Sequence, residues 1–173
     1  PARYASTRFP GKAVAELHGK PMIQHVYERG QESGARELVV ATDDQRIADT
    51  CEAFRATVCM TGDQHRSGSE RIAEVCDIMD WRDDTIVVNL QGDEPTMPAS
   101  LIDQCAALLE ESDADIGTLA SPIASPEDFN NPNVVKTVLN SAGEALYFSR
   151  SPIPHEHADL ALHHHGIYAY RAG

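Results

Sequence analysis

The chain is poor in the features that mark membrane and nucleic-acid-binding proteins. It has no apolar run approaching the roughly 18 residues of a membrane span, and no basic-then-apolar signal segment at its start. Only 14 Lys and Arg residues oppose 27 Asp and Glu residues, and the net charge of −13 disfavours broad binding to nucleic acid or to an anionic membrane. We therefore expect a soluble, cytoplasmic protein without a nucleic-acid or membrane partner.

Cysteine is also scarce, and its spacing excludes two classes of small domain. The four cysteines are Cys51, Cys59, Cys76 and Cys105. No two of them form a C-x-x-C pair, which argues against a zinc knuckle and against a disulfide framework. We expect them to be small, buried apolar side chains. With 173 residues, 42% of them hydrophobic, the chain is long enough to bury the core of a single domain.

Apolar residues alternate between a helical period and short continuous runs, and this alternation is the main indication of fold class. The helical period predicts amphipathic helices over residues 21–33, 45–54, 68–79 and 98–112. Runs rich in β-branched residues predict strands over residues 37–42, 57–60, 85–90 and 116–121. This order predicts βαβ units, and hence an α/β three-layer sandwich with a mostly parallel, Rossmann-like sheet.

Beyond Pro122 the pattern changes to strands joined by turns. Residues 134–139 and 145–148 predict a hairpin, and a histidine-rich loop then leads to a strand over residues 166–170. The histidines of that region show no metal-ligand spacing with a nearby carboxylate, so we expect no structural metal there. They are His155, His157, His163, His164 and His165. Both ends of the chain look cut, so we expect an incomplete domain that is inactive by itself.

The first twelve residues are basic within an otherwise acidic chain. Arg3, Arg8 and Lys12 concentrate positive charge there, and Gly11 with its small neighbours allows backbone N–H groups to approach phosphate oxygens. The segment contains neither a Walker A pattern nor a G-x-G-x-x-G pattern. Composition alone favours a polyanion site and a solvated basic loop about equally.

A pair of carboxylates follows the most apolar of the predicted strands. Asp93 and Glu94 come directly after residues 86–90, and ligands of open α/β sheets bind at the carboxyl ends of the strands. Mg²⁺ prefers one or two carboxylates together with phosphate oxygens and water. Taken alone, this segment is better explained as an ordinary turn. Together with a basic loop at the same sheet edge, it favours Mg²⁺-dependent nucleotidyl transfer.

A serine- and glycine-rich segment, residues 65–71, precedes the third predicted helix. The free N–H groups of such a helix start can bind a base or an anion. The simpler interpretation is that Ser67 or Ser69 caps the helix.

Eight segments carry a resemblance that covers the whole chain. They are 1–12 (PARYASTRFPGK), 19–23 (GKPMI), 41–44 (ATDD), 65–71 (HRSGSER), 89–95 (NLQGDEP), 131–136 (NPNVVK), 145–150 (ALYFSR) and 164–171 (HHGIYAYR). Together they resemble the 3-deoxy-manno-octulosonate cytidylyltransferases, also called CMP-Kdo synthetases. The related CMP-sialate synthetases match these segments less well. The resemblance implies a nucleotide-diphospho-sugar transferase fold, with a CTP-binding part over residues 1–122 and the start of a sugar-binding and dimerisation part over residues 123–173.

The resemblance also implies a role for each matching residue. The residues implied for nucleotide binding are Ala2, Arg3, Arg8, Lys12 and Ser67. Asp93 matches the aspartate that binds Mg²⁺, the expected cofactor. The residues implied for catalysis are Arg3, Lys12 and Asp93. The residues implied for the sugar pocket are Arg71, Gln91, His164 and Tyr168.

The implied reaction is attack by the anomeric hydroxyl of Kdo on the α-phosphorus of CTP, which gives CMP-Kdo and pyrophosphate for lipopolysaccharide biosynthesis in a homodimeric enzyme. Relatives have an apolar strand before residue 1 and continue past residue 173, and their counterpart of residues 154–162 is longer. Three alternatives stay open: a modified Kdo as the sugar, a transferase for sialate, and a binding module that has lost turnover. Arg3, Lys12 and Asp93 are all in place, which argues against the last.

Overall fold

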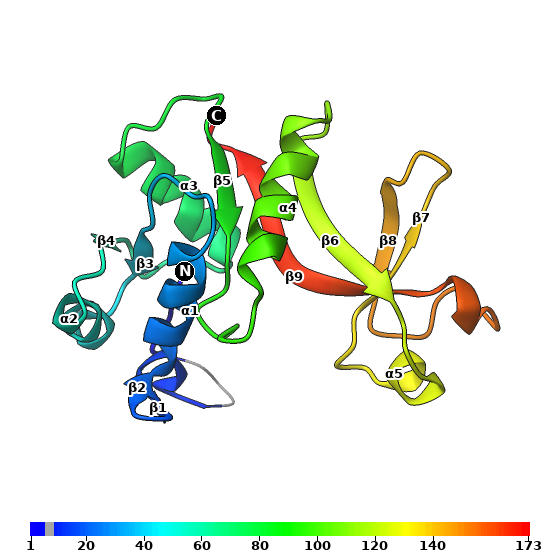
Figure 1. Cartoon of the computed structure of the whole chain (residues 1–173), viewed down its shortest axis with the longest axis horizontal. Coiled ribbons are helices and arrows are strands. Elements are labelled where there is room, and N and C mark those ends of the chain that lie inside the picture. Colours follow the sequence, from blue (N-terminus) through cyan, green and yellow to red (C-terminus); the bar gives the residue numbers. More distant parts are fainter. Residues whose placement is uncertain (6–8) are drawn as a thin grey trace. The chain divides into compact units, whose positions relative to one another are not determined.

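The four amphipathic helices lie where the sequence predicts them (Figure 1). The structure is a computed structural model that describes residues 1–5 and 9–173. The helices are α1 (Met22–Gln31), α2 (Gln45–Ala53), α3 (Gly68–Ile78) and α4 (Ala99–Glu110). Side-chain caps explain two of the starts, because Asp44 accepts a hydrogen bond from Arg46 N and Ser67 accepts one from Glu70 N.

All seven predicted strands are present, and several short elements were not predicted. The strands are β1 (Glu16–Leu17), β2 (Lys20–Pro21), β3 (Val40–Thr42), β4 (Val58–Met60), β5 (Ile86–Asn89), β6 (Ile116–Pro122), β7 (Lys136–Leu139), β8 (Ala145–Ser149) and β9 (Leu162–Arg171). The elements without a sequence prediction are β1, β2, helix α5 (Pro126–Asn130) and the 3₁₀ helices η1 (Lys12–Val14) and η2 (Ala158–Leu160). They are too short to produce a periodic signal.

Strand β9 begins earlier than predicted. His163, His164 and His165 are therefore strand residues, and the prediction of a histidine-rich loop is wrong for these three. His164 is buried while its two neighbours are half-buried, as expected where side chains alternate between the faces of a sheet. Histidine is not among the residues enriched in strands, so composition favoured a loop. The strand forms because this segment pairs with β7, with His163 opposite Lys136.

The chain divides into two units. Unit 1 comprises Pro1–Gly117 and Ile167–Gly173, and unit 2 comprises Thr118–Gly166. The expected boundary was after residue 122, whereas the observed boundary is after Gly117, five residues earlier. The last residues return to unit 1 because the end of β9 pairs with β5, with Val88 opposite Ala169.

The sheets are mixed in direction. In unit 1, β3 and β4 are parallel, with Val40 opposite Val58, and Ala2 forms a parallel bridge with Thr42. Strand β5 is antiparallel to β9, and β7 is antiparallel to both β8 and β9. The α/β class is confirmed, but the prediction of a mostly parallel sheet is wrong for the described pairs. The alternation of strands and helices predicts parallel pairing only between strands joined by a helix. Strand β9 follows the hairpin region instead, so the alternation does not predict its direction.

The core of unit 1 forms where α1 and α2 pack on the parallel strands. Ile47 and Cys51 of α2 are fully buried there, as are Cys105 and Leu109 of α4 elsewhere in the unit. All four cysteines are buried and free, which confirms their apolar role. Burial raises the pKa of the Cys51 and Cys105 thiols to about 11. Within the described ranges, no helix has the length and apolar character needed to cross a membrane.

An apolar cavity of about 970 Å³ lies between β3 and β5. Its lining includes Ile23 of α1, Val40 of β3, Ile72 of α3, Val88 of β5 and Ile102 of α4.

The first two residues connect the carboxyl ends of these two strands. Ala2 N donates a hydrogen bond to Ala41 O (2.8 Å), and Gly92 N donates one to Pro1 O (3.1 Å). The amino-terminal loop therefore starts between the ends of β3 and β5.

Unit 2 is built on the β7–β8 hairpin and a fully buried lysine. Lys136 Nζ donates hydrogen bonds to the carbonyl oxygens of Asn131 (2.9 Å), Val134 (2.6 Å) and Arg150 (2.9 Å). Three acceptors satisfy the three donors of an ammonium group, so the buried charge is well solvated by the backbone. Burial, followed by the nearby Arg150 cation, lowers the pKa of Lys136.

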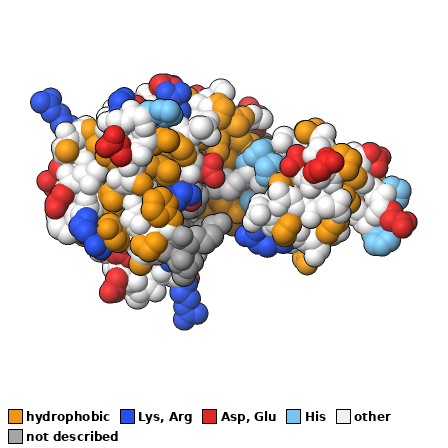
Figure 2. All heavy atoms as spheres, turned by 90° about the horizontal axis from the view of Figure 1, so that it is seen from below, with side chains coloured by type: hydrophobic (Ala, Val, Ile, Leu, Met, Phe, Trp, Pro, Cys, Tyr) orange, Lys and Arg blue, Asp and Glu red, His pale blue; other side chains and the backbone are white. Residues whose placement is uncertain are grey.

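Histidines and carboxylates gather at one end of unit 2 (Figure 2). The loop before β9 exposes His155 and Glu156, whose closest ring and carboxylate atoms are 3.9 Å apart. His157 and Asp159 form a second exposed pair at the same distance. Among the described residues, no three His, Cys, Asp or Glu side chains come together as a group that could hold a metal ion.

Candidate functional site

The amino-terminal loop is anchored at both of its ends. Ala2 is buried beside β3, and Gly11 N donates a hydrogen bond to Tyr4 O (2.8 Å). Gly11 has a φ of +72°, and a Cβ there would lie 3.1 Å from the Tyr4 ring. Glycine is therefore required both by the backbone and by the packing of Tyr4. Arg3 is half-buried beside Ala2, and Arg8 lies outside the described residues.

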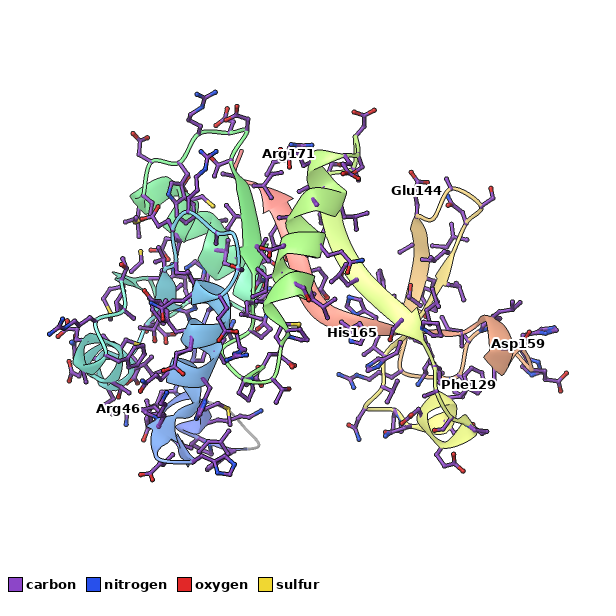
Figure 3. The ribbon with its side chains drawn as sticks, in the orientation of Figure 1. Arg46, Phe129, Glu144, Asp159, His165 and Arg171 are labelled. Atoms are coloured by element: carbon purple, nitrogen blue, oxygen red, sulfur yellow. The ribbon has the colours of Figure 1, made fainter. Side chains whose placement is uncertain are left out.

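Arg46 completes this anchor from the start of α2, where Figure 3 labels it. Its guanidinium carbon lies 3.3 Å from the centre of the Tyr4 ring, within the range of a cation–π contact. The same guanidinium donates two hydrogen bonds to the Asp44 carboxylate. The roles of Tyr4 and Arg46 could not be predicted from the sequence, because a cation–π contact between segments distant in the chain leaves no local pattern.

Lys12 and Asp93 bring the basic loop and the carboxylate pair into contact. Lys12 Nζ donates a hydrogen bond to Asp93 Oδ2 at 2.9 Å. The side chains are 37% and 45% exposed, so both remain accessible to a ligand. Ion pairs this exposed contribute little to stability, about 0–1 kcal/mol. Lys12, expected to bind phosphate, and Asp93, expected to bind the metal, are thus in direct contact although they are 81 residues apart in the sequence.

The start of α3 closes against the carboxyl end of β5. A Cβ on Gly68 would lie 3.3 Å from Gln91 Nε2 and 3.2 Å from Pro1 Cγ, so only glycine allows this approach without displacement. Gln91 donates a hydrogen bond to Asn89 Oδ1 (3.0 Å), and Asn89 is buried. The helix start, the amino-terminal loop and the end of β5 therefore form one site in unit 1.

Ser67 caps α3 at this point. Its Oγ accepts a hydrogen bond from Glu70 N (3.1 Å), and the Glu70 carboxylate accepts one from Arg66 N (2.6 Å). Glu70 thus binds the residue before the cap rather than the cap residue itself, as it would in a capping box, and the two bonds together hold the end of the preceding loop against the start of the helix. Ser67 itself remains exposed. The cap and a nucleotide-facing role are therefore compatible.

Arg71 is fully buried in the next turn of α3. It donates hydrogen bonds to Asp43 Oδ2 (2.6 Å), to Gly62 O (3.3 Å) and to Thr61 Oγ1. Its Nε is buried without a hydrogen-bond partner among the described atoms. Arg71 thus connects the residues that follow β3 and β4, and Asp43 is a further site residue that sequence analysis did not single out.

Two tyrosines of β9 lie beside the same sheet edge. Tyr168 is opposite Asn89 in the β5–β9 pair, and its ring is stacked on that of Tyr170 with centres 6.1 Å apart. The Tyr170 hydroxyl is hydrogen-bonded to Ser69 Oγ (2.7 Å). Burial, followed by the neighbouring Tyr170, raises the pKa of Tyr168. Ser69 and Tyr170 tie β9 to the start of α3, a contact that the sequence does not reveal.

His164 belongs to unit 2. Its Nε2 lies 3.0 Å from Thr118 Oγ1, and the Phe148 ring meets its imidazole edge-on with centres 4.7 Å apart. His165, labelled in Figure 3, is paired in the same way with Ser121 Oγ (2.9 Å). Burial, followed by the adjacent His165 and His163, lowers the pKa of His164, so its ring is neutral at pH 7.

Comparison with known proteins decides the family. A cytidylyltransferase family model matches residues 1–173. The 3-deoxy-manno-octulosonate cytidylyltransferase of Thioalkalivibrio sulfidiphilus is 53% identical over 184 residues, which cover 100% of this chain and 74% of the relative. The enzyme of the same name from Pseudoalteromonas atlantica is 51% identical, with 100% and 73% covered. The chain belongs to the 3-deoxy-manno-octulosonate cytidylyltransferase family.

Solved structures agree with this assignment. The structure of CMP:2-keto-3-deoxy-manno-octonic acid synthetase complexed with CTP has a TM-score of 0.89 and 42% identity, and covers 99% of this chain and 72% of its own. A cytidylyltransferase from Leptospira borgpetersenii, at 18% identity and a TM-score of 0.61, shares the fold.

Proposed function

We propose that this chain carries the CTP site and part of the sugar site of an enzyme that transfers the cytidylyl group of CTP to Kdo, in the cytoplasm, for lipopolysaccharide biosynthesis. The observation that carries the proposal is the 2.9 Å contact between Lys12 and Asp93, which joins the basic loop to the end of β5. The CTP complex of the 42% identical relative supports CTP as the nucleotide. The four free cysteines fit a reducing compartment.

In this reaction the anomeric oxygen of Kdo forms a bond to the α-phosphorus of CTP. The bond from that phosphorus to the bridging oxygen breaks, pyrophosphate leaves with the electron pair, and the hydroxyl proton passes to water. Arg3, Arg8 and Lys12 would neutralise the triphosphate, and Ser67 and the buried Ala2 would border the nucleoside. Most of the rate acceleration would come from alignment and charge neutralisation, as in phosphoryl transfer generally.

Asp93 fits a Mg²⁺ site of the kind that a nucleotide completes. It offers an accessible carboxylate at the carboxyl end of β5, beside the basic loop. Mg²⁺ bound to proteins commonly takes one or two carboxylates and fills its other positions with phosphate oxygens and water. When bound, the ion would offset charge on the triphosphate. Lys12 would then exchange its bond to Asp93 for one to a phosphate oxygen.

Four residues are proposed for the acid sugar. Gln91 and Tyr168 lie at the β5–β9 edge beside the nucleotide corner. His164 would approach the sugar as a neutral imidazole. Arg71 would act through the Thr61–Gly62 segment that it holds, because its guanidinium is fully buried.

A homodimer formed through the β7–β8 hairpin is part of the proposal. Strand β8 ends the hydrogen-bonded strand order β5-β9-β7-β8 and exposes Leu146 (66%) and Tyr147 (61%). An exposed apolar edge strand is an aggregation risk that proteins usually cover. A second copy pairing there would cover it. Light scattering on a Leu146→Lys variant should report a monomer, and an unchanged mass would exclude this surface.

The deciding experiment measures pyrophosphate release by the purified full-length protein that contains this chain, with Mg²⁺ and CTP. Kdo, N-acetylneuraminate and no sugar are compared in parallel. Release that depends on Kdo is the expected result. Release only with N-acetylneuraminate would assign the chain to a sialate transferase, and CTP binding without release would support a binding module.

A further inference from the structure

The loop between β4 and α3, residues 61–67, is held from one side by a carboxylate two turns into the helix. Glu74 accepts hydrogen bonds from Gly62 N at 2.9 Å and 3.2 Å with its two oxygens. One of these oxygens also contacts His65 Nε2. Glu74 therefore ties together the beginning and the middle of the loop. The His65 contact, followed by the bond from Gly62 N, lowers the pKa of Glu74, so the carboxylate is ionised at neutral pH.

Two other α3 side chains hold the remaining parts of this loop. Arg71 binds Thr61 and Gly62 O at the first end, and Glu70 binds Arg66 N at the last. The loop sequence Thr-Gly-Asp-Gln-His-Arg-Ser contains no large apolar side chain that would anchor it in the core. Its conformation therefore depends on these polar bonds, and Glu74 lies one helical turn from both Glu70 and Arg71.

The loop ends at Ser67, beside the corner formed by Gln91 and Gly68. On the proposed function, Ser67 borders the nucleoside. Cytosine differs from uracil by an amino group in place of a carbonyl oxygen and by an unprotonated ring nitrogen. Telling them apart requires donors and acceptors placed in fixed positions, because an unpaired polar group is what penalises the wrong base.

We propose that Glu74 is a positioning residue for nucleobase selection, which acts through Gly62 and His65 on the conformation of residues 61–67. This inference rests on the proposed function. It assigns to Glu74 no contact with the nucleotide. Its loss would let the loop adopt more than one conformation, and the groups around Ser67 would then discriminate less between CTP and UTP.

The test compares the ratio of kcat/KM for CTP to that for UTP in the wild-type enzyme and in Glu74→Ala. Misplacing a supporting group can cost up to about 100-fold in rate, and we expect the ratio to fall on the order of tenfold. Glu74→Gln keeps an acceptor for Gly62 N and should retain part of the ratio. Asp77→Ala is the matched control, because Asp77 is an exposed carboxylate on the same helix. Its ratio should equal that of the wild type.

The ratio separates positioning from stability, because a smaller folded fraction lowers both rates equally and leaves their ratio unchanged. A parallel measurement of CTP and UTP binding by calorimetry, without sugar, gives a second readout. A fall in both rates at a constant ratio would overturn the proposal, and so would unchanged kinetics. A wild-type enzyme without Kdo-dependent turnover, but with CTP bound more tightly than UTP, would fail the proposed function and leave the Glu74 test intact.

Discussion

Two parts of the site in unit 1 are held in different ways. The loop of residues 61–67 is fixed by Glu70, Arg71 and Glu74, one of which is fully buried. The charged corner is held by one ion pair between Lys12 and Asp93, both more than one-third exposed. The first arrangement costs free energy to disturb, whereas the second can be exchanged for bonds to a ligand at little cost.

On the proposed function, this difference separates nucleobase selection from the transfer chemistry. Groups that must recognise a shape work best when they are rigid before the ligand arrives, since the ordering cost is then already met during folding. Charges that must follow a triphosphate through a reaction need partners that they can leave. The substitutions below test whether the two parts respond as differently as their contacts indicate.

The largest effect is expected at the charged corner. Asp93→Asn removes the proposed metal ligand and should lower kcat/KM by about 1,000-fold, a typical loss for an electrostatic group in a transition state. Because the carboxylate is 45% exposed, the melting temperature should shift by no more than about 2 °C. Pyrophosphate release and differential scanning calorimetry measure the two. Retained activity would show that Asp93 is not the essential ligand.

Replacing the buried Arg71 should, unlike the Asp93 substitution, strongly lower the free energy of unfolding. Arg71→Met leaves Asp43 without its guanidinium partner, and breaking a buried pair costs about 3–5 kcal/mol. Asp43 is partly exposed, so we expect the lower end of that range. Urea denaturation of the variant measures the loss. The double variant Arg71→Met with Asp43→Asn should recover part of the stability, and no recovery would place the cost in packing rather than in the ion pair.

The loop anchor at Gly11 should give an intermediate effect. Gly11→Ala forces a left-handed residue to carry a Cβ that lies 3.1 Å from the Tyr4 ring, and should cost about 1–2 kcal/mol. Gly143→Ala is the control, since its φ is +83° but no atom lies within 4 Å of the added Cβ. Urea denaturation should show the smaller loss for Gly143→Ala. Equal losses would mean that the Tyr4 contact contributes nothing.

The smallest effect concerns pH. Contacts with His65 and Gly62 N lower the pKa of Glu74 from 4.5, so its ionised form is favoured by folding. The stability from this carboxylate is complete above pH 4.5 and is lost as pH falls through the folded pKa. The difference in melting temperature between wild type and Glu74→Gln should therefore shrink below about pH 4.5. A difference that grew in acid would reverse the assigned direction of the shift.

Much of the fold could be predicted because it is encoded locally. Apolar periodicity, together with the Ser67 cap, places the helices within a few residues of their observed ends. Strand direction was not accessible in the same way, because the antiparallel pairing of β9 with β5 joins segments some 80 residues apart. Local pattern carries no information on such a pair.

The site shows the same division. Lys12 and Asp93 were predicted separately from charge and from position after a strand, and the structure joins them. The supporting residues Tyr4, Asp43 and Glu74 were missed, since each acts through a contact with a segment that has no sequence pattern of its own. Supporting residues are harder to predict than the groups they support, because their chemistry is ordinary and only their neighbours are distinctive.

The path of β9 has a consequence for the order in which the protein can fold during synthesis. Leu162–Gly166 of this strand belong to unit 2, and the residues from Ile167 onward belong to unit 1. Strand β5 leaves the ribosome long before the segment that pairs with it, so one edge of β5 stays unpaired while all of unit 2 is translated. Unit 2 is contiguous and can form its hairpin at once, whereas unit 1 gains its β9 segment only after unit 2 has been translated.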